Sequence, residues 1–344
     1  MAERNIILCV GSRQDPHVNA VQSYLRDINS ELKLILFNPL CTNHYIDITI
    51  GNDSLYSCVI TTGEQRTCAE SVRAVWYRWK PKKFSAGDSV DDAFIAKDFA
   101  LEEWKNVMQS TEVFIPRALW MNRLRSADQI QSKAFQLRLA QGCGLKIPLT
   151  KITNDSASVQ SLFAANPPVR VISKPLTPLF IPPTKRVRPR EISLEYVIAA
   201  SSTISIFPGI FQELIERDVD LCVVVVKDVV VAARVHPKKC FGHATNKVDE
   251  SDAEAIGRGT YKISDWLEKC ILSFHHQAGL VFAVYDFLEV GEDEFIFLDC
   301  NPCGSWLCLD YSTGLEITRL VAEALAGITR HNATMSVLKQ FENL

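Results

Sequence analysis

No stretch of this sequence reaches the ~18 consecutive apolar residues that a membrane-spanning helix needs. The apolar run near the N-terminus ends at Val10, and no cleavage site of small residues follows it. Net charge is −3, with 37 basic and 40 acidic residues, so no global field would hold a nucleic-acid backbone. We therefore expect a cytoplasmic protein that uses neither a membrane nor a nucleic acid as its partner.

Several common catalytic motifs are also missing. The sequence has no Gly-x-x-x-x-Gly-Lys loop, no His-Glu-x-x-His and no Gly-x-Ser-x-Gly. These absences argue against P-loop nucleoside triphosphatases, zinc proteases with the His-Glu-x-x-His motif and serine hydrolases with the Gly-x-Ser-x-Gly motif.

Cysteine gives little sign of a disulfide or zinc framework. The 11 cysteines are odd in number and lie mostly in apolar strings, as expected of reduced, buried thiols. Cys300 and Cys303 have the Cys-x-x-Cys spacing of redox and zinc sites, but no second pair at zinc spacing accompanies them. His275 and His276 lie upstream. We favour packing thiols and leave the metal or redox reading open.

What the sequence does contain is a large apolar fraction in alternating helical and strand patterns. Its 344 residues are 47% hydrophobic and 22% charged, which predicts a globular chain of two or three domains. Strand–helix–strand patterning over residues 5–37, shorter strands up to residue 77 and an amphipathic stretch over 91–110 predict a first α/β unit. It should end near residue 120.

The middle of the chain carries two lysines in structured settings. The pattern predicts one helix over 126–142, with Ser126 as its N-cap and Lys133 in its middle. A strand over 169–174 ends at Lys174, and a proline-rich, basic loop follows over 175–190. That loop either closes on an anionic ligand or is simply solvated.

The last third is rich in strands. It predicts a hairpin over 221–226 and 229–235, a helix over 264–278, a second hairpin over 281–290 and 295–298, and a final helix over 315–326.

Oxygen-bearing side chains gather at the end of the second hairpin. Asp286 lies on its first strand, and Asp299 and Asn301 leave its second strand. Residues two apart on a strand share a face, so these three side chains should point the same way. Oxygen ligands are those that Mg²⁺ prefers, usually with nucleotide phosphates completing its shell. The plainer alternative is a turn residue followed by a strand end.

The order of these features resembles the ATP-grasp superfamily. The local strings are similar to those of the ribosomal-protein glutamate ligases and of the graspetide (microviridin-type) peptide-crosslinking ligases. The resemblance covers roughly residues 75–330 and is carried by five strings, 131–137, 144–150, 172–176, 211–215 and 297–304.

This resemblance implies an α/β fold with α+β lobes: a Rossmann-like pre-grasp domain over 1–120, a small central lobe over 121–205 and a C-terminal lobe over 206–344. It also implies ATP and Mg²⁺ as cofactors. The residues that it assigns are Lys133 and Lys174 for the phosphates, with Lys174 also catalytic, Gln212, Glu213, Leu214 and Ile215 for adenine, Asp220 for ribose, Asn246 for the nucleotide, and Asp286, Asp299 and Asn301 for Mg²⁺.

The sequence departs from the family pattern at three places. Asp299 stands where a longer Glu is usual, and Cys222 and Ala244 stand where arginines are usual. Arginine is the residue best suited to a bidentate grip on phosphate. Arg234, Lys239 and His243 are candidates to compensate, and we expect Arg234 to be catalytic.

The resulting hypothesis is an ATP-dependent ligase that activates a carboxylate as an acyl phosphate for attack by an amine or hydroxyl. Its substrate would be a ribosomally made peptide, with or without a leader, in which it forms lactam or ester side-chain crosslinks; a homodimer is left open. One alternative is an amino-acid or dipeptide ligase or a glutamate-adding enzyme. Another is a catalytically degenerate protein that only binds a peptide or nucleotide.

Overall fold

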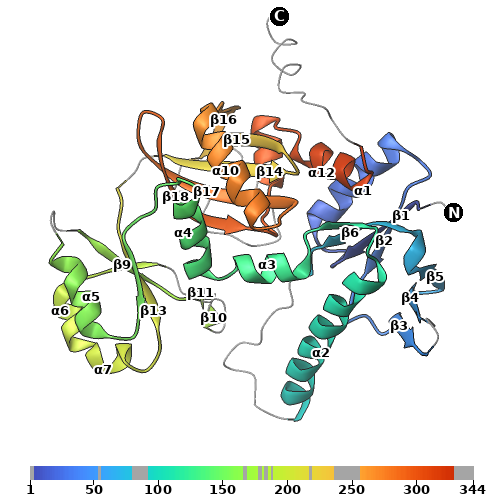
Figure 1. Cartoon of the computed structure of the whole chain (residues 1–344), viewed down its shortest axis with the longest axis horizontal. Helices are drawn as coiled ribbons and strands as arrows, with labels where there is room; N and C mark the ends of the chain where they lie inside the picture. The colour runs from blue at the N-terminus through green and yellow to red at the C-terminus, as the bar shows by residue number, and fades with distance from the viewer. Residues whose placement is uncertain are drawn as a thin grey trace, which may run out of the picture. The chain divides into compact units, whose positions relative to one another are not determined.

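The computed structural model describes residues 4–52, 56–79, 92–165, 169–176, 180–181, 185–186, 189–216, 219–235 and 256–328 (Figure 1). The chain groups into two compact units. The first contains residues 1–79, 113–121 and 316–344, and the second contains residues 80–112 and 122–315.

The first unit is built on a parallel sheet of order β2-β1-β6-β7 (Lys33–Phe37, Ile6–Val10, Val72–Tyr77 and Leu119–Met121). Every residue of β1 is buried, as expected for the centre of a parallel sheet. Helix α1 (Pro16–Ile28) begins at the N-cap Asp15, with proline at its first position. It packs against α12 (Ile317–Leu325), which also contacts β6.

A separate antiparallel sheet of β3 (His44–Ile50), β4 (Tyr56–Thr62) and β5 (Gln65–Cys68) completes this unit, with the short 3-10 helix η1 (Ala69–Ser71) after it. The parallel sheet is the predicted N-terminal α/β arrangement. Helix α12 groups with this unit although its residues belong to the predicted C-terminal lobe, and the three-part division of the chain stays a prediction.

The second unit contains a small antiparallel sheet of order β12-β9-β13-β8 (Arg190–Ile192, Val171–Lys174, Gly209–Glu213 and Thr150–Thr153). Its apolar core includes residues of the helices α5 (Ser156–Phe163), α6 (Leu194–Ala199) and α7 (Ser201–Ile204). The two-residue strands β10 (Phe180–Ile181) and β11 (Lys185–Arg186) pair within the predicted basic loop.

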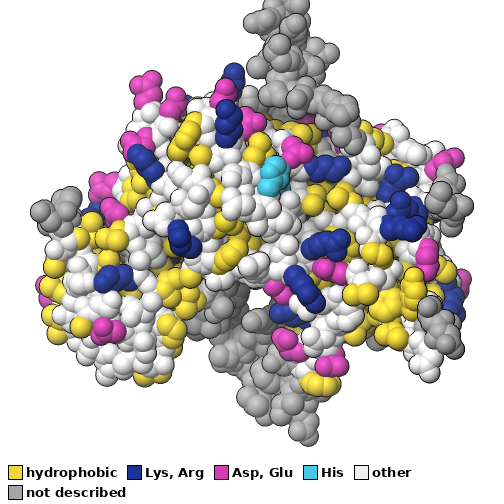
Figure 2. All heavy atoms as spheres, in the orientation of Figure 1, with side chains coloured by type: hydrophobic (Ala, Val, Ile, Leu, Met, Phe, Trp, Pro, Cys, Tyr) yellow, Lys and Arg dark blue, Asp and Glu magenta, His cyan; other side chains and the backbone are white. Residues whose placement is uncertain are grey.

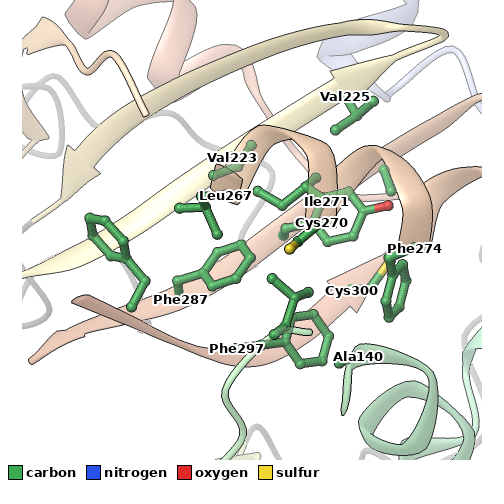
Figure 3. Close-up of a cluster of buried hydrophobic side chains, with 14 of the residues drawn as sticks. Ala140, Val223, Val225, Leu267, Cys270, Ile271, Phe274, Phe287, Phe297 and Cys300 are labelled. Carbon is green, nitrogen blue, oxygen red and sulfur yellow. The ribbon is translucent and has the colours of Figure 1, made fainter. Parts of the chain in front are cut away.

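The larger sheet of this unit is antiparallel and has the order β16-β15-β14-β17-β18 (Ile256–Thr260, Val229–Val235, Asp220–Val226, Phe282–Gly291 and Glu294–Asn301). The predicted hairpins are confirmed as β14–β15 and β17–β18. Helix α10 (Asp265–Gln277) covers one face, because its apolar residues recur at Leu267, Ile271 and Phe274 and point at the strands (Figure 3). This core holds the sheet that carries the candidate site on its other face.

Four further helices are described. The predicted helix over 126–142 is in fact two helices, α3 (Leu124–Ile130) and α4 (Lys133–Gly142). Ser132 lies between them and is the N-cap of α4, where its side chain accepts a hydrogen bond from Phe135 N. The other two are α2 (Asp92–Phe114) and α11 (Leu307–Thr313). None of the described helices is both long and apolar enough to cross a bilayer.

Candidate functional site

The three predicted oxygen ligands do share one face of the larger sheet. Asp286 on β17 lies directly opposite Asp299 on β18, and Val284 lies opposite Asn301. Side chains alternate along a strand, so Asp286, Asp299 and Asn301 all project from the face opposite α10. We call these three residues the acidic row. Its geometry matches the prediction made from their spacing.

A β-bulge makes this arrangement possible. Phe295 and Phe297 are buried in the α10 core, and strict alternation would turn Asp299 to that same side. The pairing shifts between Asp286 and Phe287, whose partners are Asp299 and Phe297, so Leu298 is the extra residue. The bulge reverses the alternation of side chains along β18 and places Asp299, whose side chain is partly exposed, on the face opposite α10.

Lys133 meets the acidic row from helix α4. Its Nζ donates a hydrogen bond to Asp299 Oδ1, in a pair that is partly exposed on both sides. Because α4 begins at Lys133, this lysine is at the N-terminus of the helix and not in its middle as predicted. The partial positive charge of the helix end and the ammonium group thus act at the same place, an arrangement suited to an anion.

The carboxyl group of Asp286 has a raised pKa. Burial raises its pKa to about 7, and the nearby negative charges of Asp299 and Asp220 act in the same direction, while the charge of Lys133 opposes them. Asp220 is buried at the start of β14. Negative charge is therefore concentrated beyond what one lysine balances, which favours a bound cation.

The donor set fits a magnesium ion that shares its shell with a ligand. In the part of the chain that the structure describes, no three His, Cys, Asp or Glu side chains form a closed metal cage. Asn301 Oδ1 also accepts a hydrogen bond from Cys303 N at 3.0 Å. Two facing carboxylates with an adjacent amide are instead the partial set that Mg²⁺ uses when substrate phosphates supply further oxygens.

Lys174 and Gln212 meet on the small sheet. Lys174 Nζ donates to Gln212 Oε1 at 2.5 Å, and Gln212 Nε2 donates to Thr150 Oγ1 at 2.8 Å. Gln212 is buried and lies on β13, next to the strand that ends at Lys174. The lysine is thus held at a strand end by a buried amide.

The segment that follows β13 is already hydrogen-bonded to its neighbours. Glu213 N donates to Leu149 O at 2.9 Å, and Leu214 N donates to Arg170 O at 2.7 Å. Glu213 Oε2 also accepts from Leu149 N at 3.2 Å. Any adenine contact with the backbone of Glu213 or Leu214 would therefore use their carbonyl groups, while Ile215 is partly buried beside them.

Arg234 does not join the acidic row. It lies opposite Leu221 on β14, and Leu221 faces the α10 core, so Arg234 is on the other side of the sheet from Asp286. There its guanidinium forms a bidentate pair with Glu289, with Nε to Oε2 at 2.9 Å, and stacks 4.1 Å from the ring centre of Tyr261. The pair raises the pKa of Arg234.

Cys222 stands where the resemblance predicts an arginine, and Arg234 was one of the residues expected to compensate for its loss. It lies directly opposite Asp286 on β14, in register with the acidic row. Asn246, like Ala244, Lys239 and His243, lies outside the described residues. The face that carries the acidic row therefore has a thiol opposite Asp286.

Two residues that sequence reasoning did not single out hold this site together, Asn122 and Gln136. Both are buried carboxamides that hydrogen-bond to the backbone of β17, β18 or the turn after β18. Gln136 lies within the predicted helix over 126–142, and nothing in the sequence of that helix set it apart. Asn122, between two elements, offered none.

Comparison with known proteins gives a structural answer only. No protein-family model matches the sequence, and no curated protein matches it significantly. Solved structures do match in fold. The macrocyclase MdnC from Microcystis aeruginosa, bound with the precursor peptide MdnA, superposes with a TM-score of 0.78 at 21% identity, covering 94% of this chain and 99% of that one.

Two further structures agree with it. A RiPP-associated ATP-grasp ligase from Chryseobacterium gregarium, in complex with ADP and a leader and core peptide, has a TM-score of 0.77 at 20% identity, covering 96% of this chain and 100% of that one. The ATP-grasp ligase PsnB, complexed with a precursor peptide and AMPPNP, has a TM-score of 0.71 at 20% identity, covering 96% and 99%. The predicted fold is confirmed: over nearly its whole length, this chain has the α/β fold of the ATP-grasp ligases.

Proposed function

We propose that this chain is an ATP- and Mg²⁺-dependent ligase that joins side chains of a peptide through an acyl phosphate. One observation carries the proposal: Lys133 and the acidic row converge on the same face of a sheet in a fold shared with peptide-bound ATP-grasp ligases. Those solved structures hold precursor peptides, and two of the ligases hold ADP or AMPPNP.

The chemistry follows from the weakness of a carboxylate as an electrophile. Its oxygen attacks the γ-phosphorus of ATP, giving an acyl phosphate and ADP. An amine or hydroxyl of the same peptide then attacks the acyl carbon, inorganic phosphate leaves, and each bond formed removes the mass of one water. The protein itself forms no covalent bond in this scheme. It positions the reacting groups and stabilises the charge that develops on them.

The side chains divide this task by charge. Lys133 and Lys174 would offset the negative charge that develops on the transferring phosphoryl group. Asp286, Asp299 and Asn301 would hold Mg²⁺, which neutralises phosphate oxygens and orients them for in-line attack.

The nucleoside would lie along the segment after β13. Gln212, Glu213, Leu214 and Ile215 would contact adenine, and the buried carboxylate of Asp220 would accept hydrogen bonds from ribose hydroxyls. In this scheme residues 121–205 and 206–344 form the two lobes around the nucleotide, and residues 1–120 form the pre-grasp domain. A leader segment on the peptide, a homodimer and a cytoplasmic location complete the proposal.

The proposal is tested by product mass. Synthetic peptides that carry Asp or Glu together with Lys, Ser or Thr are incubated with the chain, ATP and Mg²⁺, and ADP release is followed alongside mass spectrometry. We expect loss of one water per ADP formed, and loss of both signals in Asp299→Asn and Lys174→Met. ADP formation with free amino acids but with no peptide would favour the amino-acid ligase instead.

One observation favours a second candidate, a nucleotide- or peptide-binding protein without turnover. Cys222 faces Asp286 where an arginine would stabilise phosphate, and Arg234 is committed to Glu289 on the opposite side of the sheet. Binding of Mg²⁺ and nucleotide without ADP release on any of the peptides would support this candidate.

A further inference from the structure

The strand that carries Asp299 and Asn301 is at the edge of its sheet. Among the described residues, β18 pairs with β17 on one side, and its other side has an isolated parallel bridge between Ile296 and Lys146. Cys300, between the two metal-ligand candidates, is only 2% exposed. Backbone groups that are buried at a sheet edge need partners other than water, because an unpaired buried N–H or C=O is destabilising.

Gln136 supplies these partners. Cys300 N donates to Gln136 Oε1 at 3.1 Å, and Gln136 Nε2 donates to Cys300 O at 2.9 Å. A carboxamide has the donor and acceptor arrangement of a peptide group, so the side chain pairs with β18 as one residue of a further strand would. Its second N–H donates to Ile130 O at the end of α3, and the side chain is 1% exposed.

The same helix delivers Lys133 to Asp299. Gln136 follows Lys133 by three residues on α4, and residues at this spacing lie on the same side of a helix. The helix is therefore attached to β18 at two adjacent points, through Gln136 at Cys300 and through Lys133 at Asp299.

We propose that Gln136 is a positioning residue, whose carboxamide sets the place of Lys133 and the orientation of Asp299 relative to one bound ligand. The Lys133–Asp299 pair is partly exposed and competes with solvent, whereas the Gln136 bonds are buried, so the buried clamp is the part that fixes the geometry. This inference rests on the proposed function, because the ligand in question is the magnesium nucleotide.

Asn122 shows what a purely architectural amide does in the same unit. Its Oδ1 accepts from Val281 N at 2.6 Å and Phe282 N at 2.8 Å, and its Nδ2 donates to Phe282 O at 2.7 Å and Pro302 O at 2.8 Å. These bonds tie the start of β17 to the turn after β18. None of them reaches the helix that carries Lys133.

The test compares Gln136→Met with Gln141→Met. Methionine keeps the length of the side chain and removes the carboxamide. Gln141 is an exposed glutamine of the same helix, and its Oε1 accepts a hydrogen bond from Arg138 Nη1. Calorimetric titration with Mg²⁺ and a non-hydrolysable ATP analogue measures the binding of folded protein, and thermal unfolding is recorded in parallel. We expect Gln136→Met to weaken binding about tenfold and to raise the Mg²⁺ concentration at half-saturation, and Gln141→Met to change neither.

A lower unfolding temperature with unchanged affinity in Gln136→Met would overturn the proposal, since a merely structural role predicts that result. If Gln136→Met does not fold, Gln136→Asn replaces it: the amide is kept but withdrawn by one methylene, and the same loss of affinity is expected. Failure of the unaltered chain to bind the analogue would refute the proposed function itself, and this inference with it.

Discussion

Replacing Asp286 by asparagine should stabilise the ligand-free protein at high pH. Unfolded, this carboxyl group ionises near its ordinary value of 3.8, and in the folded chain its pKa is about 7. The folded state therefore holds the proton more tightly, and the free energy of unfolding falls as the pH rises from about 4 to about 7. Above pH 7 the folded state bears the full free-energy cost of the ionised Asp286 carboxylate. Below pH 4 this cost vanishes, because the group is protonated in both states.

The size of the effect follows from the same two values. The rise from 3.8 to about 7 corresponds to ~4 kcal/mol at about 1.4 kcal/mol per pH unit. Solvent reaches the partly buried side chain and screens part of this penalty, so we expect Asp286→Asn to gain about 2 kcal/mol at pH 8. In a unit of this size that is about 4 °C in the unfolding temperature.

The assay is scanning calorimetry without Mg²⁺ or nucleotide at pH 8 and pH 4, with Asp228→Asn as the control. Asp228 is an exposed residue of the turn between β14 and β15, paired only with His276 among the contacts described. Asp286→Asn should raise the unfolding temperature at pH 8 and leave it unchanged at pH 4. An equal gain at both values, or a loss at pH 8, would refute the reasoning about crowded carboxylates.

Three further substitutions give outcomes that can be told apart. Cys222→Arg places a guanidinium beside the acidic row, and gained ADP release would show that turnover had been lost by degeneration; unchanged release would argue against that history. Gly304→Ala should lower the unfolding free energy by about 1–3 kcal/mol in urea titrations, because its Cβ would lie 2.4 Å from Val284 Cγ2. A neutral result would show that the turn relaxes. Burial acts to raise the pKa of Asp15, but the hydrogen bonds from His17 and the charge of Arg78 outweigh it, so the pKa is lowered. The ionised carboxylate therefore stabilises the fold fully above about pH 4 and less as the pH falls. Asp15→Asn should therefore lower the unfolding temperature at pH 7 more than at pH 3, and an equal loss at both would contradict this.

The distribution of surface charge agrees with an anion site formed by a few neighbouring side chains and not by a field of one sign over the whole protein. Basic and acidic side chains are interspersed over the face drawn in Figure 2, and both kinds occur over each part of it. An anionic ligand on this face would therefore be met by individual side chains. The convergence of Lys133 with the helix N-terminus of α4 is such a local arrangement.

Local periodicity was enough to predict the two hairpins and the shared face of Asp286, Asp299 and Asn301. It succeeded for Asp299 because the residues were taken in steps of two from Asn301. Counting from Phe295 and Phe297 gives the opposite face, and only the bulge at Leu298 reconciles the two counts. A bulge depends on how both strands pack, which one strand's sequence does not contain.

The side of the sheet on which Arg234 lies could have been predicted from the sequence of the first hairpin. The two-residue turn between β14 and β15 pairs Val226 with Val229, and that register places Arg234 opposite Leu221. Leu221 alternates with Cys222, so Arg234 could have been assigned to the face away from the site. The break between α3 and α4 is different, because Ser126 and Ser132 are equally good caps and tertiary contacts decide between them.

The central claim is that side chains far apart in the sequence surround one magnesium nucleotide. It is tested most directly by a crystal structure of the chain with Mg²⁺ and a non-hydrolysable ATP analogue. The account predicts Mg²⁺ on Asp286 and Asp299, with the phosphates contacted by Lys133 and Lys174. Nucleotide bound at another surface, or none at saturating concentration, would contradict it.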